Sequence, residues 1–196
     1  MELPLLLSRP LKIVGLFCAM SVGGCDKESA VPKQPQATEI TQAATPAAPG
    51  VLDRSHKGQP IPAFTVSDAA GKKLDLSSLK GKPVLVNLWA TWCAPCVAEL
   101  PTLDRLSAIK GDRLHVITVS QDMKTDKVAA FLKDKGGEHL PAWLDPNTEL
   151  SFKFQVQTLP TTILYDAGGK ELWRFVGGQE WDRGDAGKLL LEAGVN

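Results

Sequence analysis

The stretch Pro83-Val-Leu-Val-Asn-Leu-Trp-Ala-Thr-Trp-Cys-Ala-Pro-Cys96 decides which fold this sequence can adopt. Residues 83–89 form an apolar, β-branched run that is typical of a buried strand. Beyond Cys93, apolar residues recur at helical spacing, at Val97, Leu100, Leu103 and Leu106. Cys93 is therefore predicted at the junction between a buried strand and the first turn of a helix.

The two cysteines of this stretch are spaced as a redox pair. At a helix N-terminus, unpaired N–H groups and the helix dipole favour a thiolate over a thiol, which makes Cys93 the expected nucleophile. Cys96 lies one turn further along, close enough to attack a mixed disulfide on Cys93 and release the product. The pattern predicts dithiol–disulfide exchange that uses no metal and no other cofactor.

Other uses of a C-x-x-C pair have less support in the sequence. Zinc requires four ligands, but the other two cysteines, Cys18 and Cys25, lie in an N-terminal targeting stretch, and the histidines are scattered. A structural disulfide across three residues closes almost no loop and would stabilise little. Thiolates also suit Cu(I), although the chain after Cys25 has one methionine, Met123, and no histidine near the pair. A Cu(I)-binding module remains the alternative from a different functional class.

Trp92-Cys-Ala-Pro-Cys96 after a buried strand resembles the thioredoxin superfamily. The longer string from Asn87 to Pro101 resembles its TlpA/ResA-like branch of membrane-anchored periplasmic thiol–disulfide oxidoreductases, and the resemblance extends roughly from Gly58 to Val195. It implies an α/β thioredoxin-like fold with a central mixed sheet, helices on both faces, an N-terminal hairpin and a central insert.

The pattern of the remaining chain agrees with this fold class. Strands alternate with helices, which favours parallel pairing with helices on both faces. Strands are expected at 64–66, 73–75, 83–89, 114–119, 142–144, 158–165 and 171–176. Helices are expected after Cys93 and at 124–135, 148–154 and 182–193.

The resemblance implies a substrate-binding surface around the cysteines. Pro160 matches the cis-proline that faces the cysteine pair in this fold, although base rates alone would favour a trans bond. The backbone of the preceding Leu159 would then pair with a bound substrate strand. Trp92 is expected to cover the disulfide as an apolar partner, whereas Trp89 is expected in the core.

A proton-transfer group is expected on the helix that carries the cysteines. Thioredoxin has a buried aspartate six residues before its first cysteine, and this chain has Asn87 there, which cannot take a proton. Glu99, three residues after Cys96 on the same helix face, matches a glutamate of the TlpA-like pattern and is the expected replacement. The alternative is an ordinary solvated carboxylate.

Residues 1–25 are predicted to be a lipoprotein signal and anchor segment. An apolar stretch at 13–22 follows two basic residues and is too short to span a bilayer comfortably. Val22-Gly-Gly-Cys25 resembles a bacterial lipobox, so Cys25 is the expected lipidation site, and Asp26 resembles a signal for retention in the inner membrane. An uncleaved anchor or an ordinary signal peptide is the alternative.

Residues 26–55 are predicted to be a flexible linker, because their early part is rich in Pro, Ala, Thr and Gln. This leaves 56–196 as the thioredoxin-like domain. The chain has 22 basic and 22 acidic residues, so it lacks the basic surplus of a nucleic-acid partner. The predicted location is the periplasmic face of the inner membrane.

The resemblance favours a disulfide reductase. Ala94-Pro95 between the cysteines resembles the Gly-Pro of reductants more than the Pro-His of strong oxidants. The implied partners are client proteins with disulfides or vicinal cysteines and a membrane electron donor. The implied processes are cytochrome c maturation or reduction of cysteines at an oxidase copper site. A disulfide oxidase or isomerase is the alternative within the same chemistry.

Overall fold

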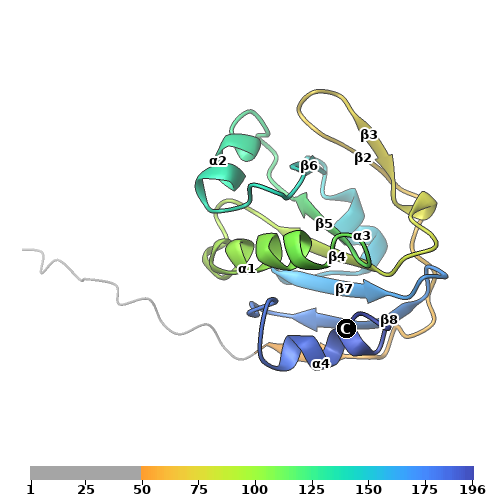
Figure 1. Cartoon of the computed structure of the whole chain (residues 1–196). Helices are drawn as coiled ribbons and strands as arrows, with labels where there is room; N and C mark the ends of the chain where they lie inside the picture. Colours follow the sequence, from red (N-terminus) through yellow and green to blue (C-terminus); the bar gives the residue numbers. More distant parts are fainter. Residues whose placement is uncertain (1–49) are drawn as a thin grey trace, which may run out of the picture. The chain divides into compact units, whose positions relative to one another are not determined.

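The computed structural model describes residues 50–196 (Figure 1). Within this range, the strands join in one mixed sheet of order β1-β8-β7-β4-β5-β6-β2-β3. The strands are β1 (Val51–Asp53), β2 (Thr65–Ser67), β3 (Lys73–Asp75), β4 (Val84–Trp89), β5 (His115–Ser120), β6 (Trp143–Leu144), β7 (Thr161–Tyr165) and β8 (Glu171–Val176). The helices are α1 (Ala94–Lys110), α2 (Val128–Asp134), α3 (Glu149–Phe154) and α4 (Asp185–Leu191), with a 3-10 turn at Leu76–Ser78.

Strand β4 lies at the centre of the sheet, and all six of its residues are buried. It pairs in parallel with β5 and antiparallel with β7, so that Asn87 lies between Thr118 and Thr162. Because side chains alternate along a strand, Asn87 points to the same face as Leu85 and Trp89. A polar side chain thus occupies the middle of an otherwise apolar row.

Each face of the sheet has its own apolar core. One core joins the sheet to α1, α2 and α4 through residues such as Leu103, Leu132 and Leu190. The other packs the opposite face against α3, through Leu150 and Phe154. Figure 1 shows α1 lying along the central strands and α4 beside β8. The start of α1 follows closely on the end of β4.

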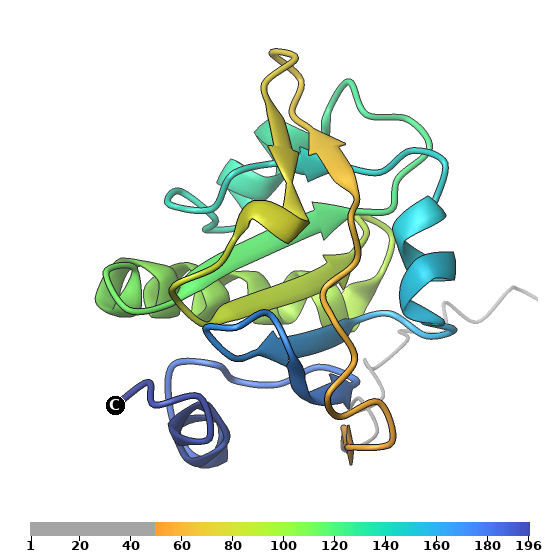
Figure 2. The same cartoon turned by 90° about the vertical axis from the view of Figure 1, so that its right-hand side faces the viewer.

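The hairpin and the insert of the predicted fold are both present. Strands β2 and β3 pair antiparallel and form a hairpin that projects from the sheet (Figure 2). The segment 139–154 supplies β6 and α3, as predicted. Helices α2 and α4 are shorter than the predicted 124–135 and 182–193, because neither has a side-chain cap and the flanking residues form turns.

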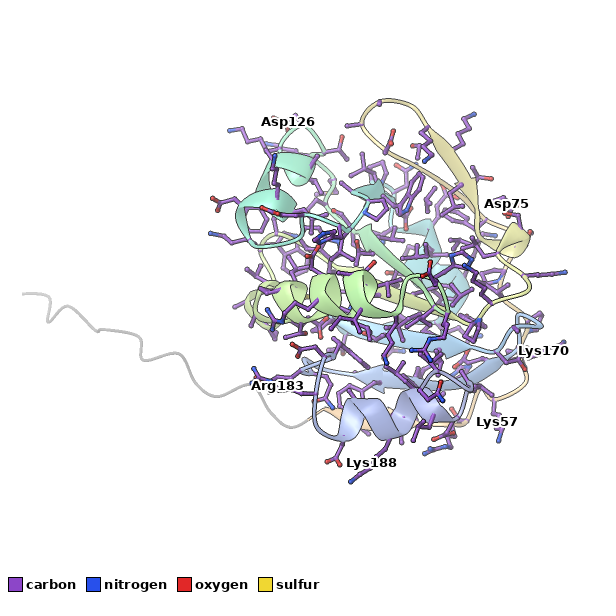
Figure 3. All side chains as sticks on the ribbon, viewed as in Figure 1. Lys57, Asp75, Asp126, Lys170, Arg183 and Lys188 are labelled. Carbon is purple, nitrogen blue, oxygen red and sulfur yellow. A yellow bond between two sulfur atoms is a disulfide. The ribbon has the colours of Figure 1, made fainter. Side chains whose placement is uncertain are left out.

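Charged side chains of both signs lie around the periphery of the domain. Figure 3 labels six of them, which point outward from different elements: Lys57, Asp75, Asp126, Lys170, Arg183 and Lys188. This distribution agrees with the balanced charge of the sequence.

The start of the domain differs from the prediction. Val51–Asp53, placed in the predicted linker 26–55, form β1 and pair antiparallel with residues 174–176 of β8. Unlike β2 and β3, which form a local hairpin, β1 pairs with a strand far away in the sequence, so no neighbouring turn indicates it. The predicted segment 1–25, with Cys25, and residues 26–49 of the linker lie outside the described residues. From Gly50 to Asn196, no helix combines the length and hydropathy needed to cross a bilayer.

Candidate active site

The two cysteines lie where β4 gives way to α1, as the sequence predicts. They form a disulfide, with 5.3 Å between their Cα atoms. Cys93 is the N-cap of α1, and the N–H of Cys96 donates to its Sγ at 3.4 Å. Cys93 is 6% exposed and Cys96 is fully buried. An incoming thiol or disulfide therefore reaches Cys93 first.

The loop before Cys93 is held by a carboxylate that the sequence analysis did not single out. Asp122 accepts hydrogen bonds from the N–H of Thr91 at 3.0 Å and from its hydroxyl at 2.7 Å. The Asp122 carboxylate also accepts from the Ser120 hydroxyl at 2.7 Å. Because β4 and β5 are parallel, their carboxyl ends meet, and this topology could have indicated the contact.

Glu99 is a buried residue, only 2% exposed, on the inner face of α1. Its Oε1 accepts from Asn87 Nδ2 at 2.7 Å. Its Oε2 accepts from the N–H of Gln179 at 3.1 Å and from the indole N–H of Trp181 at 3.0 Å. The alternative of a solvated surface carboxylate is therefore wrong. Gln179 and Trp181 lie about 80 positions along the chain from Glu99, and no local pattern pointed to them.

The environment of Glu99 changes its proton affinity. Burial raises the pKa of Glu99 to about 7, because a charged carboxylate loses its hydration inside the protein. The hydrogen bonds from Trp181, Asn87 and Gln179 lower the pKa, but less than burial raises it. A carboxyl group that exchanges its proton near neutral pH thus lies one helical turn beyond Cys96.

The Leu159–Pro160 peptide bond is cis, as expected. The Pro160 carbonyl accepts from the N–H of Gly177 at 2.9 Å. The next residue, Gly178, packs on the cysteine motif, since a Cβ built there would lie 3.3 Å from the Pro95 carbonyl oxygen. Pro160 is therefore linked to the cysteine motif through two glycines.

Trp92 and Trp89 have opposite environments. Trp89 is fully buried and stacks on Phe131, with 6.3 Å between ring centroids, as expected for a core residue. Trp92 is 71% exposed and faces solvent more than the predicted covering role requires. Together with the exposed Met123, it lines a hollow of about 570 Å³ beside the cysteine loop. A second hollow, of about 270 Å³, lies across Pro95 and is lined by Glu99, Gly178 and neighbouring residues.

The Redoxin family model matches residues 56–190, which include both cysteines and Glu99. The chain belongs to the Redoxin family. It is 35% identical over 143 residues to the thiol:disulfide interchange protein DsbE of Vibrio cholerae, covering 72% of this chain and 76% of that protein. It is 35% identical over 123 residues to the thiol-disulfide oxidoreductase ResA of Bacillus cereus, covering 62% of this chain and 70% of that one.

A solved structure from Chlorobium tepidum, described as a DsbE-type thiol:disulfide interchange protein, has the same fold. Its TM-score is 0.64 at 29% identity, and the match covers 70% of this chain and 96% of that one. The predicted thioredoxin-like fold and the TlpA/ResA-like resemblance are thus confirmed. This redoxin is a thiol–disulfide oxidoreductase.

Proposed function

We propose that this redoxin reduces disulfides of client proteins at the periplasmic face of the inner membrane. The observation that carries the proposal is a cysteine pair at a helix N-terminus with a buried, readily protonated glutamate one turn beyond it. The proposed clients are proteins with disulfides or vicinal cysteines, and the processes they serve are cytochrome c maturation or maintenance of an oxidase copper site.

The proposed reaction begins with the reduced pair. The Cys93 thiolate attacks one sulfur of the client disulfide, which forms a mixed disulfide and releases the first client thiolate. Cys96 then loses its proton and attacks Cys93 Sγ, which forms the Cys93–Cys96 disulfide and releases the second client thiolate. The client gains two electrons and the redoxin loses two. A dithiol protein in the membrane is the proposed electron donor that restores the reduced pair.

Glu99 is the proposed base for the second step. Cys96 is fully buried, so its proton needs an acceptor inside the protein. With a pKa of about 7, Glu99 is partly ionised at neutral pH and can take a proton and later return it. The hollow bounded by Pro95, Glu99 and Gly178 provides a route between this carboxyl group and solvent.

Leu159, Pro160 and Trp92 are the proposed docking residues. Within residues 50–196, neither the N–H nor the C=O of Leu159 forms a backbone hydrogen bond, which leaves both free for an extended client segment. The exposed Trp92 ring supplies apolar contact next to Cys93.

Reduction is the proposed net direction because the Cys93 thiolate has the helix N-terminus but no cation between the cysteines to stabilise it. Ala94 and Pro95 place no cation between the cysteines, and ionised Glu99 disfavours a second negative charge. A poorly stabilised reduced form corresponds to a low reduction potential. Lipidation at Cys25, proposed from Val22-Gly-Gly-Cys25, would hold the domain at the membrane surface.

A glutathione titration of the Cys93–Cys96 couple tests the direction. We expect a potential closer to about −270 mV, as in thioredoxin, than to about −120 mV, as in DsbA. A value near the latter would assign an oxidase instead. Trapping with Cys96→Ser should capture clients as mixed disulfides on Cys93, and the double variant that also carries Cys93→Ser is the matched control.

A further inference from the structure

The Asn87 side chain forms hydrogen bonds through its amide nitrogen but not through its amide oxygen. Its Nδ2 donates to Glu99 Oε1 at 2.7 Å and to the Thr162 hydroxyl at 2.9 Å. Its Oδ1 is fully buried and has no hydrogen-bond partner within residues 50–196. A buried amide oxygen without a partner is unfavourable, because it loses its hydration and gains no hydrogen bond in return. In this orientation both N–H groups of the amide are hydrogen-bonded and its oxygen is not, which suits an ionised Glu99 that can only accept.

The surroundings of Glu99 decide which oxygen a proton occupies. Oε2 already receives the N–H groups of Gln179 and Trp181, and neither group can accept a hydrogen bond. An added proton therefore belongs on Oε1. There it would meet Asn87 Nδ2, another donor, and two donors facing each other repel.

A half-turn of the Asn87 amide removes this conflict. The Cβ–Cγ torsion of asparagine is broad and roughly two-fold, so rotation exchanges Nδ2 and Oδ1 at little torsional cost. Oδ1 would then accept from the protonated Glu99 and from the Thr162 hydroxyl. Nδ2 would occupy the place where Oδ1 now has no partner. Each orientation leaves one amide atom unsatisfied, so neither is locked.

We propose that Asn87 is a positioning residue that holds the Glu99 carboxyl group in both protonation states, donating to the carboxylate through Nδ2 and accepting from the carboxylic acid through Oδ1. This inference rests on the proposed role of Glu99 in exchange. It assigns a role to the amide at the position where thioredoxin has an aspartate. The amide takes no proton itself, but it turns whenever the neighbouring carboxyl group gains or loses its proton.

The charged groups nearest this cluster have partners of their own. On the connection between β8 and α4, Glu180 pairs with Arg183 at 2.9 Å. Asp182 pairs with Arg105 of α1 at 2.6 Å. The causes that shift the pKa of Glu99 are burial and three neutral donors, with no charge among them. The Asn87 amide is therefore the group whose orientation must follow the proton.

Nuclear magnetic resonance on the oxidised, full-length protein tests the proposal, because the disulfide cysteines do not titrate. We expect the Asn87 side-chain NH₂ signals and the Glu99 carboxyl carbon to titrate together, with one midpoint near pH 7. Glu99→Gln mimics the protonated acid, since its amide N–H groups face Asn87 while its oxygen keeps Gln179 and Trp181. Asn87 in this variant should match the low-pH wild type at every pH. Asn87 signals that stay constant while Glu99 titrates would overturn the proposal.

Variants separate positioning from general packing. Asn87→Leu keeps the branched shape but removes a charge-assisted hydrogen bond to the carboxylate and a weaker, neutral one to the acid. Because the stronger bond is lost from the charged form, the pKa of Glu99 should rise from about 7 to about 8. The pH profile of disulfide exchange should move upward with it. Thr118→Val is the matched control, because Thr118 lies opposite Asn87 in β5 and its hydroxyl donates to the Pro141 carbonyl.

The outcomes also separate this inference from the proposed function. Unchanged Glu99 titration in Asn87→Leu, or an equal change in Thr118→Val, would contradict the positioning role. Coupled titration of Asn87 and Glu99 in a protein that does not reduce disulfides would instead contradict the proposed function and leave the positioning role standing.

Discussion

Two buried glutamates of this redoxin, Glu99 and Glu171, have opposite partners. Glu171 on β8 is 1% exposed and forms two hydrogen bonds of 2.8 Å with Arg174. Arg174 also donates to the Phe154 carbonyl, so its charge is held in place. Glu99 is as deeply buried but meets only neutral donors. Glu171 therefore pairs with an opposite charge inside the protein, whereas burial without such a charge raises the pKa of Glu99.

Breaking the buried ion pair of Glu171 and Arg174 should have the largest effect. Arg174→Met leaves Glu171 buried without its cation, and removing one member of a buried pair costs about 3–5 kcal/mol. Denaturant unfolding measures this loss. Lys188→Met removes an exposed ion pair with Asp185 and should cost far less, because solvent screens the two charges. Equal effects of the two variants would contradict the assigned difference between buried and exposed pairs.

Glu99→Gln should change how stability depends on pH. The pKa of Glu99 rises from 4.5 to about 7 on folding, so the folded state binds the proton more tightly than the unfolded state. The stability that protonated Glu99 contributes is fully present below pH 4.5 and is lost as the pH rises through 7. The wild type should therefore lose up to about 3 kcal/mol across this window.

The variant should lack that loss and exchange disulfides at least about 100-fold more slowly. Unfolding free energies at several pH values, together with single-turnover exchange rates, measure both effects. Parallel stability curves for the two proteins would show that Glu99 does not titrate in this window.

Gly178→Ala should disturb the loop that donates to Glu99. The new Cβ would lie 3.3 Å from the Pro95 carbonyl oxygen, so the loop must move by a few tenths of an ångström. We expect a loss of about 1 kcal/mol and a higher pKa for Glu99, because the Gln179 bond lengthens. Gly187→Ala in α4 meets no atom within 4 Å and should be neutral or slightly stabilising. Equivalent behaviour of the two variants would argue against the contact with Pro95.

Trp92→Ala should have the smallest effect on stability, below about 0.5 kcal/mol, because the side chain is 71% exposed. Exchange with a protein client should nevertheless slow several-fold, while exchange with glutathione should change little. Phe152→Ala on α3 removes a side chain that is 79% exposed and serves as the control. A client rate that does not respond to Trp92→Ala would remove this residue from the docking surface.

The local part of the site could be predicted from the sequence, and the long-range part could not. The strand-to-helix junction at Cys93 follows from hydrophobic periodicity, and the placement of Glu99 beyond Cys96 follows from helical spacing. The donors Gln179 and Trp181 reach Glu99 only through tertiary packing. Nothing within the sequence of α1 indicates that they are there.

The pair on β8 escaped prediction for a different reason. Residues three apart on a regular strand face opposite sides, so simple alternation separates Glu171 from Arg174. The pairing of β8 with β7 shifts register beside Leu164 and Tyr165, which matches Trp173 and Glu171 to consecutive residues. Such a bulge turns the two charges to the same face.

The pH titration of the Glu99 carboxyl carbon in the oxidised protein tests the central claim most directly. Burial of Glu99 among neutral donors, without the cation that Glu171 has, predicts a midpoint of about 7 for Glu99. Signals should be assigned by their loss in Glu99→Gln. A midpoint at the ordinary value near 4.5 would contradict the account, because Glu99 would then be fully ionised at neutral pH and could not return a proton.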